Sequence, residues 1–231
     1  MSDLVFTFWE GKMPEYIKLC MSTWKFPYVV LNYSNLKQYT DFDAKRVQSF
    51  SLPQIADCIR IHVLKDNGGC WLDADTIILK NELPSANILG NSETRSNTIG
   101  FLRSDDCSEM FAAWASYQDD VLNQKDPSHH WSIFGNAFTD PYLKEHLEVH
   151  IGDIMKYWPE LALVESLSRR NKYKVFYFEK HKHLVDIPDT NMLMLHNSWT
   201  PDWYKKLSTK EILSQSCTLS NMFREVLCNI S

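Results

Sequence analysis

The sequence contains few glycines and prolines and no long apolar run. Seven glycines and nine prolines among 231 residues exclude collagen-like and linker-rich chains. No window reaches the ~18 consecutive apolar residues that a membrane-spanning helix needs. The N-terminus also lacks the basic and apolar regions of a cleavable signal. We therefore expect a compact protein that is made and kept in the cytosol.

The sequence also lacks a basic excess and several common catalytic motifs. A formal net charge of -5 argues against a general nucleic-acid binder. The six cysteines show no C-x-x-C spacing and lie mostly in apolar periodic segments, so we interpret them as reduced packing residues. The absence of G-x-x-x-x-G-K-[ST], G-x-G-x-x-G, G-x-S-x-G and H-E-x-x-H removes P-loop, Rossmann dinucleotide, hydrolase-elbow and zinc-hydrolase interpretations.

Strand-like and helix-like segments alternate along the chain, and the 44% of hydrophobic residues can build a full core. Apolar and aromatic runs predict strands at 4–9, 28–31, 97–102, 174–178 and 192–195. Apolar residues at helical spacing predict helices from about 14, over 54–65, over 108–122, from about 141, and over about 208–229 with a break at Ser220. Gly68 and Gly69 should end the second helix with positive φ angles. The alternation favours an α/β sheet flanked by helices.

Two carboxylates, Asp73 and Asp75, follow Gly68-Gly69 and a short apolar run. Along an extended backbone the side chains at i and i+2 share a face, so both can approach one cation. Such a pair leaves most of an octahedral shell to water and phosphate oxygens, which suits Mg²⁺ or Mn²⁺ bound with a nucleotide diphosphate. A D-x-D sequence alone is more often a solvated turn, but the glycine pair and the apolar strand favour the metal interpretation.

Asp57 and Arg60 lie three residues apart on the helix that precedes the carboxylate pair. This spacing permits a weak surface ion pair. The alternative is that the helix presents a carboxylate and a guanidinium to substrate hydroxyls.

Aromatic and imidazole side chains follow two of the predicted strands. His196, after the run 192–195, is either an ordinary buried histidine or a ligand that completes a metal shell. Phe8 and Trp9 end the first strand and serve either in core packing or in stacking on a base.

In this chain order, Phe8-Trp9-x-Gly11-x-x-Pro14, Ala56-Asp57-x-x-Arg60, Gly68-Gly69-x-x-x-Asp73-x-Asp75 and His196-x-Ser198-Trp199 resemble the DXD-motif sugar transferases of capsular polysaccharide synthesis. These belong to glycosyltransferase family 32, which includes initiating mannosyltransferases and is related to the clostridial glucosylating toxins. The resemblance is strong over about 53–80, moderate at the two ends, and weak over about 85–190. Ala56 departs from the serine that the family commonly has before the aspartate.

The resemblance implies a single GT-A catalytic domain over 1–231, with a Rossmann-like mixed sheet, an acceptor-side region at about 85–190 and a C-terminal helical segment. It also implies that a sugar is moved from a nucleotide-sugar donor, with UDP-sugars favoured, to a growing surface polysaccharide or lipid-linked oligosaccharide. Retention of anomeric configuration would let the departing phosphate take the acceptor proton. An inverting enzyme would need a carboxylate base, for which Asp105, Asp106 and Asp140 are candidates that the sequence does not rank.

The resemblance further implies roles for individual residues. Trp9, with Phe8, would contact the base. Asp57 and Arg60 would hold hydroxyls of the donor sugar, and Asn136 lies in a loop that would approach the sugar. The remaining implied roles concern the metal and the diphosphate: Asp75 and His196 bind Mn²⁺ or Mg²⁺, Asp73 reaches the ribose or the metal through water, and Ser198 and Trp199 touch the diphosphate.

A basic cluster interrupts this acidic protein between 169 and 182. It is either a solvated face or a contact with the anionic inner face of a membrane, and it consists of Arg169, Arg170, Lys172, Lys174, Lys180 and Lys182. Two functional alternatives also stay open: a nucleotidyl- or phospho-transfer enzyme that uses the Asp-x-Asp metal site, and a catalytically silent sugar-nucleotide-binding module.

Overall fold

The computed structural model describes residues 4–104, 108–162, 167–179 and 190–228, and the chain divides into two compact units. The first unit comprises Met1–Glu10, Phe26–Asp73 and Pro84–Ile154. The second comprises Gly11–Lys25, Ala74–Leu83 and Met155–Ser231. One boundary falls between Asp73 and Ala74, so the two carboxylates of the Asp-x-Asp sequence belong to different units. The expectation of one catalytic domain over 1–231 stays a prediction.

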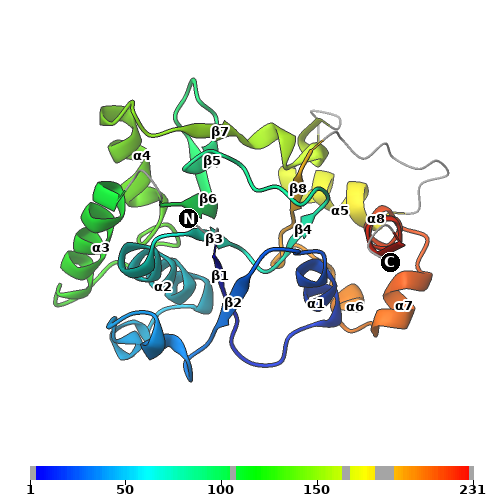
Figure 1. Ribbon diagram of the computed structural model, residues 1–231, viewed down its shortest axis with the longest axis horizontal. Helices are drawn as coiled ribbons and strands as arrows, with labels where there is room; N and C mark the ends of the chain where they lie inside the picture. The colour runs from blue at the N-terminus through cyan, green and yellow to red at the C-terminus, as the bar shows by residue number, and fades with distance from the viewer. Residues whose placement is uncertain (1–3, 105–107, 163–166, 180–189, 229–231) are drawn as a thin grey trace. The chain divides into compact units, whose positions relative to one another are not determined.

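The first unit is built on a six-stranded mixed sheet with the strand order β2-β1-β3-β6-β5-β7 (Figure 1). β1 pairs in parallel with both β2 and β3, whereas β6 is antiparallel to β3 and β5. The strands are β1 (Val5–Phe8), β2 (Tyr28–Leu31), β3 (Cys70–Leu72), β5 (Ile88–Gly90), β6 (Asn97–Arg103) and β7 (Ile151–Asp153). This sheet with its helices confirms the predicted α/β fold class and is consistent with a GT-A-like Rossmann fold.

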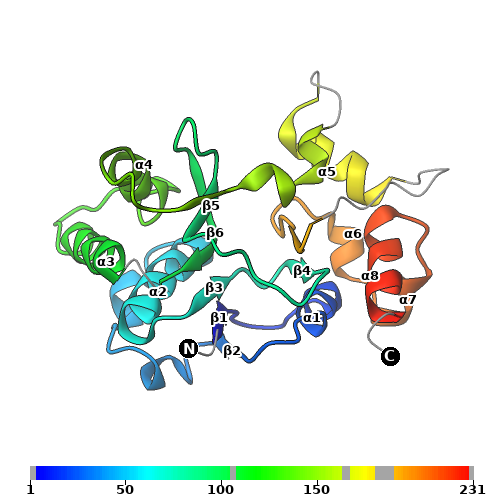
Figure 2. The ribbon, with the colours of Figure 1, turned by 45° about the horizontal axis from the view of Figure 1, so that its top comes forward.

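Three helices of the first unit, α2 (Leu52–Asn67), α3 (Ser108–Leu122) and α4 (Asn136–Glu145), lie on one side of the strands (Figures 1 and 2). Short 3₁₀ turns at Leu36–Gln38 and Ala44–Val47 connect β2 to α2. α2 begins at a capping box, in which the Ser51 backbone N–H donates to the Gln54 side chain at 3.1 Å. The apolar faces of the helices and the sheet share one hydrophobic core that includes Phe6, Ile59, Trp71, Phe111 and Trp114.

The turn between α2 and β3 positions β3, the strand that leads to Asp73. Gly68 and Gly69 have φ angles of +69° and +80°, as predicted for a helix end. A Cβ atom on Gly69 would lie 2.5 Å from the Leu4 carbonyl oxygen. The missing side chain therefore lets the Cys70 N–H donate to that same oxygen at 3.0 Å, which begins the pairing of β3 with β1.

The second unit contains a two-stranded antiparallel ribbon in which Thr76 pairs with Met194. Its strands are β4 (Thr76–Ile78) and β8 (Met192–Met194). Its helices are α1 (Glu15–Ser22), α5 (Arg169–Phe178), α6 (Asp202–Lys205), α7 (Thr209–Ser214) and α8 (Thr218–Cys228), with 3₁₀ turns at Ile154–Lys156 and Pro159–Ala162. None of the helices in the described part of the chain is long and apolar enough to cross a bilayer.

Residues 174–178, predicted as a strand, instead form the second half of α5, so that prediction was wrong. The buried side chains Tyr173, Phe176 and Tyr177 recur at helical spacing, and Ser168 caps the helix by accepting from the Asn171 N–H. A run of aromatic residues is compatible with both a strand and a helix. Here the Ser168 cap favours the helix.

The C-terminal helix breaks at Gln215, between α7 and α8, and not at Ser220 as predicted. Ser220 is buried inside α8, where its hydroxyl lies 2.9 Å from the hydroxyl of Tyr204. The helix predicted from about 141 begins earlier, at Asn136. The described cysteines form no disulfide with one another, and all of them except Cys228 are buried, as expected of packing residues. Cys107 lies outside the described residues.

We predict that Gly69→Ala destabilises the protein much more than Gly11→Ala. Both glycines have φ near +80°, so an alanine at either position costs about 1 kcal/mol in backbone strain. Only at Gly69 would the new methyl overlap a backbone oxygen, which adds about 1–3 kcal/mol. Urea unfolding of both variants measures the difference, and equal losses would contradict the close packing of this turn.

Candidate active site

The carboxyl ends of β1 and β3 lie at the same edge of the sheet, because the two strands are parallel. Trp9 follows β1 and Asp73 follows β3. The Asp73 N–H donates to the Gly100 carbonyl of β6 at 2.9 Å, so the backbone holds this carboxylate at the sheet edge. Ligands of open α/β sheets bind at such edges.

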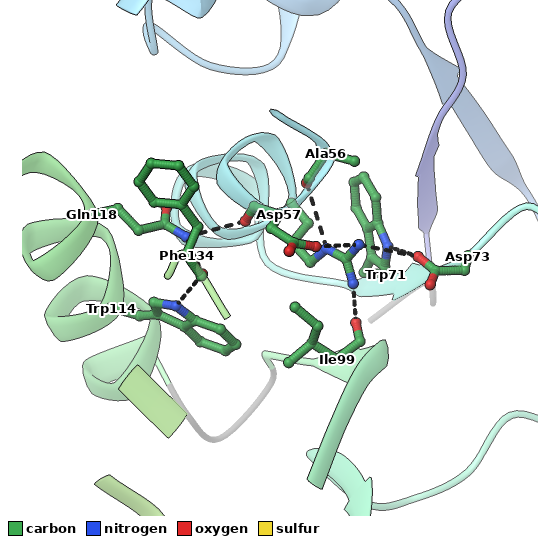
Figure 3. A network of polar contacts seen from close by, with 9 residues as sticks. Ala56, Asp57, Trp71, Asp73, Ile99, Trp114, Gln118 and Phe134 are labelled. Atoms are coloured by element: carbon green, nitrogen blue, oxygen red, sulfur yellow. Dashed lines mark hydrogen bonds and ion pairs between the residues drawn. The ribbon is translucent and has the colours of Figure 1, made fainter. Parts of the chain in front are cut away.

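Arg60 is the centre of the polar network at this edge. Its partners Asp57, Asp73 and Ile99 are labelled in Figure 3. Its guanidinium nitrogen lies 2.9 Å from the Asp57 carboxylate and 3.3 Å from Oδ1 of Asp73. A second nitrogen donates to the Ile99 carbonyl, and the guanidinium carbon lies 5.0 Å from the centre of the Trp71 ring. The Trp71 indole N–H also donates to Oδ1 of Asp73, at 2.8 Å. Oδ1 of Asp73 is therefore doubly engaged, which leaves Oδ2 for a ligand.

The alternative of a surface ion pair between Asp57 and Arg60 is wrong, because the Arg60 side chain is only 5% exposed. Burial raises the pKa of Asp57 to about 6, although Arg60 opposes this shift and Asp73 adds to it. Arg60 is on the same helix as Asp57, as the sequence predicted, but its donors point at protein oxygens. Arg60 therefore orients the carboxylates of Asp57 and Asp73.

The loop before α4 borders Asp57. A Cβ on Gly135 would lie 2.7 Å from the Ile99 side chain and 3.8 Å from Oδ2 of Asp57. Asn136 follows, and its amide donates to the carbonyl and side-chain oxygens of Asn97 at 3.0 and 3.1 Å. Gln118, which sequence reasoning missed, ties the loop to α2 by donating to the carbonyls of Phe134 and Asp57.

The two aromatic residues at the end of β1 have different environments. Phe8 is buried, and its ring meets Tyr33 edge to face at a centroid distance of 5.6 Å. Trp9 is partly exposed, yet its indole nitrogen is buried and has no hydrogen-bond partner among the described residues. Tyr33, which the sequence did not single out, lines a cavity of about 490 Å³ together with Leu36 and Ile55. Phe8 is thus a packing residue, and Trp9 and Tyr33 are the rings available to a base.

In the second unit, the ribbon of β4 and β8 brings the segment after β8 to Asp75. The Leu195 N–H donates to the Asp75 carbonyl at 3.0 Å. The Asn197 N–H donates to Oδ2 of Asp75 at 2.6 Å, although the two residues are 122 positions apart. Tyr16 of α1 donates its hydroxyl hydrogen to the Asn197 side chain. His196 therefore precedes a residue whose backbone holds the Asp75 carboxylate.

His196 lies in an aromatic cluster, with ring centroids 4.0 Å from Trp199 and 5.1 Å from Trp158. Its Nε2 is buried, lies 4.0 Å from Oε1 of Glu160, and has no hydrogen-bond partner in the described part of the chain. Burial, and secondarily Arg169, lowers the pKa of His196 to about 3, so the imidazole is neutral. The neutral ring therefore keeps a lone pair that a metal ion could use.

The other predicted residues fall at varied places. Ser198 is exposed in the turn after His196, and Trp199 is partly buried there. Asp140 accepts a hydrogen bond from the Asn97 amide at 2.9 Å. The basic residues Arg169, Arg170, Lys172 and Lys174 lie on α5. Lys180, Lys182, Asp105 and Asp106 lie outside the described residues.

The residues present fit a hard divalent cation for which water and phosphate oxygens supply most of the ligands. Among the described residues, no three His, Cys, Asp or Glu side chains are grouped so as to enclose a metal ion. Asp75 offers carboxylate oxygen, and the neutral His196 lies beside its backbone partner. Mg²⁺ and Mn²⁺ accept such open oxygen-rich sites, whereas a structural zinc site needs four protein ligands.

A family model described as capsular polysaccharide synthesis protein matches residues 1–187. This range contains Trp9, Asp57, Arg60 and both carboxylates of the Asp-x-Asp sequence, and it ends before His196. No curated protein and no solved structure matches the chain.

We predict that Arg60→Met lowers the free energy of unfolding by about 3–5 kcal/mol, because it leaves the buried Asp57 carboxylate without its counter-charge. The matched control is Arg46→Met, which removes an exposed ion pair with Asp119 and should cost about 0–1 kcal/mol. Urea titration of both variants provides the comparison. A loss at Arg60 as small as that at Arg46 would contradict the organising role of Arg60.

The pH dependence of stability should report on Glu160. Burial raises its pKa from 4.5 to about 7, so folding disfavours its ionised form. The stability that the protonated Glu160 carboxyl contributes is fully present below pH 4.5 and is lost as the pH rises through about 7. The free energy of unfolding should fall over this range by an amount on the order of 3 kcal/mol.

Glu160→Gln removes this titration. In EDTA, the stability of the variant relative to wild type should rise between pH 4.5 and 8, as measured by urea unfolding. Glu148→Gln, on an exposed carboxylate, should show no such rise. A stability difference for Glu160→Gln that does not change with pH would contradict the deep burial of this carboxyl.

Proposed function

Because the chain belongs to the family of capsular polysaccharide synthesis proteins, we propose that it is a glycosyltransferase. It moves a sugar from a nucleotide-sugar donor, with UDP-sugars favoured, to a growing surface polysaccharide or a lipid-linked oligosaccharide. The observation that carries the proposal is the buried Arg60 network, which holds Asp57 and Asp73 at the carboxyl edge of the sheet, inside the matched range. A polar network at this edge is where an α/β sheet binds its ligand.

The nucleotide base is assigned to the end of β1. Trp9 offers a partly exposed indole, and the neighbouring Tyr33 lines a cavity of about 490 Å³. A cavity of this size is within the range of small-molecule sites. Stacking of a base on an aromatic ring contributes ~1–3 kcal/mol. Phe8 supports this site from the core through its contact with Tyr33.

Asp75 is assigned to Mn²⁺ or Mg²⁺, with His196 as a further ligand. The bound cation would neutralise the charge that develops on the leaving nucleoside diphosphate. The Asn197 N–H orients the Asp75 carboxylate, and burial keeps His196 neutral and able to donate a lone pair. Asp73, through Oδ2, reaches the ribose or a water of the metal. Ser198 and the indole of Trp199 donate to phosphate oxygens.

The donor sugar is assigned to the Asp57 side of the same edge. Oδ1 of Asp57 is held by Arg60, so the carboxylate is preoriented to accept from sugar hydroxyls. Asn136, the first residue of α4, follows Gly135, which borders Asp57. The reaction retains the anomeric configuration, and the departing phosphate takes the acceptor proton, so that the chain supplies no general base.

The acceptor side is assigned to about 85–190. The acceptor would be met in the cytoplasm at the inner face of the membrane, where the basic residues Arg170, Lys172 and Lys174 of α5 can contact anionic lipid.

The proposal is tested with a panel of nucleotide sugars in Mn²⁺, scored by thermal shift and by release of nucleoside diphosphate. We expect one donor to stabilise the protein and to be slowly hydrolysed without an acceptor. EDTA should abolish release reversibly, and Asp75→Asn should lower it at least a hundredfold while the protein stays folded. Asp120→Asn, on the exposed face of α3, is the control and should keep full activity.

The outcomes separate the alternatives. A nucleotidyl- or phospho-transfer enzyme would release no nucleoside diphosphate from any sugar donor. A silent binding module would show a thermal shift without turnover. Full activity in EDTA, or in Asp75→Asn, would remove the metal from the proposal.

A further inference from the structure

In the second unit, a guanidinium lies close to two indole rings. Arg169 begins α5, and its guanidinium carbon lies 3.9 Å from the centre of the Trp158 ring and 5.5 Å from that of Trp199. Both distances are within the range of cation–π contact. The rings fix the side chain, although Arg169 itself remains at the surface. The cation is therefore preorganised and still accessible to a ligand.

Arg169 is not paired with a carboxylate of the described residues. Of the ion pairs in the described part of the chain, none involves Arg169. Glu160 is close enough to oppose the lowering of the Arg169 pKa by burial, but the two side chains form no ion pair. A guanidinium that is held by two rings and is not paired with a carboxylate keeps its N–H donors available to an anion.

The cluster around Arg169 contains further polar atoms without partners. Trp158 is 7% exposed, and its indole N–H is buried with no acceptor among the described residues. Nε2 of His196 and Oε1 of Glu160 are likewise buried and have no hydrogen-bond partner among the described residues. The ring of His196 lies against both Trp158 and Trp199, the two rings that hold Arg169. The guanidinium is thus part of the same cluster as the turn that holds Asp75.

We propose that Arg169 binds a diphosphate group, and that this group is the one carried by the nucleotide-sugar donor. The inference rests on the proposed function for the identity of the donor. The planar guanidinium presents paired N–H donors that match two non-bridging phosphate oxygens. The positive charge stabilises the diphosphate as it leaves, together with the groups assigned to the phosphate in the 196–199 turn. This proposal gives Arg169 a different role from the other members of the basic cluster in which the sequence analysis placed it.

Two other roles for Arg169 are compatible with its position. It could serve only as a counter-charge and packing partner for Glu160 and the indoles, or its ligand could be the phosphate of a membrane lipid. Arg170 is the matched control, because it is the next residue of the same helix, is exposed, and makes no contact with the indole pair.

The test is calorimetric titration of the full chain with UDP, uridine and inorganic pyrophosphate, each with Mn²⁺. Arg169→Gln should weaken the binding of UDP and of pyrophosphate by about tenfold to a hundredfold, the loss expected for charge-assisted hydrogen bonds. Uridine should bind as to wild type. Arg169→Lys keeps the charge without the fork and should be intermediate, and it replaces the glutamine variant if that variant does not fold. Arg170→Gln should change none of these affinities more than twofold.

Several outcomes would overturn the inference. Unchanged pyrophosphate affinity in Arg169→Gln would show that the residue is only a counter-charge, and so would absence of pyrophosphate binding to wild type. Sedimentation with anionic vesicles separates the lipid source: a loss of vesicle binding in Arg169→Gln, with pyrophosphate binding intact, would assign the residue to the membrane. Pyrophosphate binding that depends on Arg169, in a protein that hydrolyses no nucleotide sugar, would support this inference while refuting the proposed function.

Discussion

The buried guanidinium of Arg60 is the constraint on which the candidate site depends. A charge at this depth is tolerated only when it is fully paired, and Arg60 is paired with Asp57, Asp73 and the Ile99 carbonyl. These partners come from α2, from the end of β3 and from β6, so one side chain fixes a helix and two strands at the carboxyl edge of the sheet. The same pairing aims two carboxylates at the place where an α/β sheet binds ligand. The ion pairs that compensate for the burial of Arg60 are therefore the same ones that preorganise the site.

A second group of buried polar residues organises the other carboxylate of the Asp-x-Asp sequence. Asp75 is held by the Asn197 backbone, and the adjacent His196 is kept neutral by its burial among Trp158, Trp199 and Glu160. Arg169, at the surface beside Trp158, supplies a positive charge next to this group. Asp73 and Asp75 thus have separate supporting networks, although Ala74 alone separates them along the chain.

Much of this arrangement could be predicted from local sequence. The capping box and apolar spacing of α2, the glycine pair after it and the apolar run before Asp73 all follow from short-range rules, and they put Asp57 and Arg60 on one helix. The burial of Arg60 could not be predicted, because its partners at Ile99 and Asp73 are brought to it by strand pairing. Glu160 was missed for the same reason: nothing near it in the sequence marks a carboxyl that faces His196. The aromatic run in α5 was misread because its residues suit a strand as well as a helix.

The central claim is that Asp75 and its neighbours bind the metal and diphosphate of a nucleotide sugar. A crystal structure of the protein with UDP and Mn²⁺ tests it most directly. The account predicts anomalous density for Mn²⁺ at coordination distance from the Asp75 carboxylate, with diphosphate oxygens on the same ion and the uracil against Trp9. Mn²⁺ and UDP bound away from Asp75, for example in the cavity lined by Lys37, Arg46 and Lys65, would contradict it.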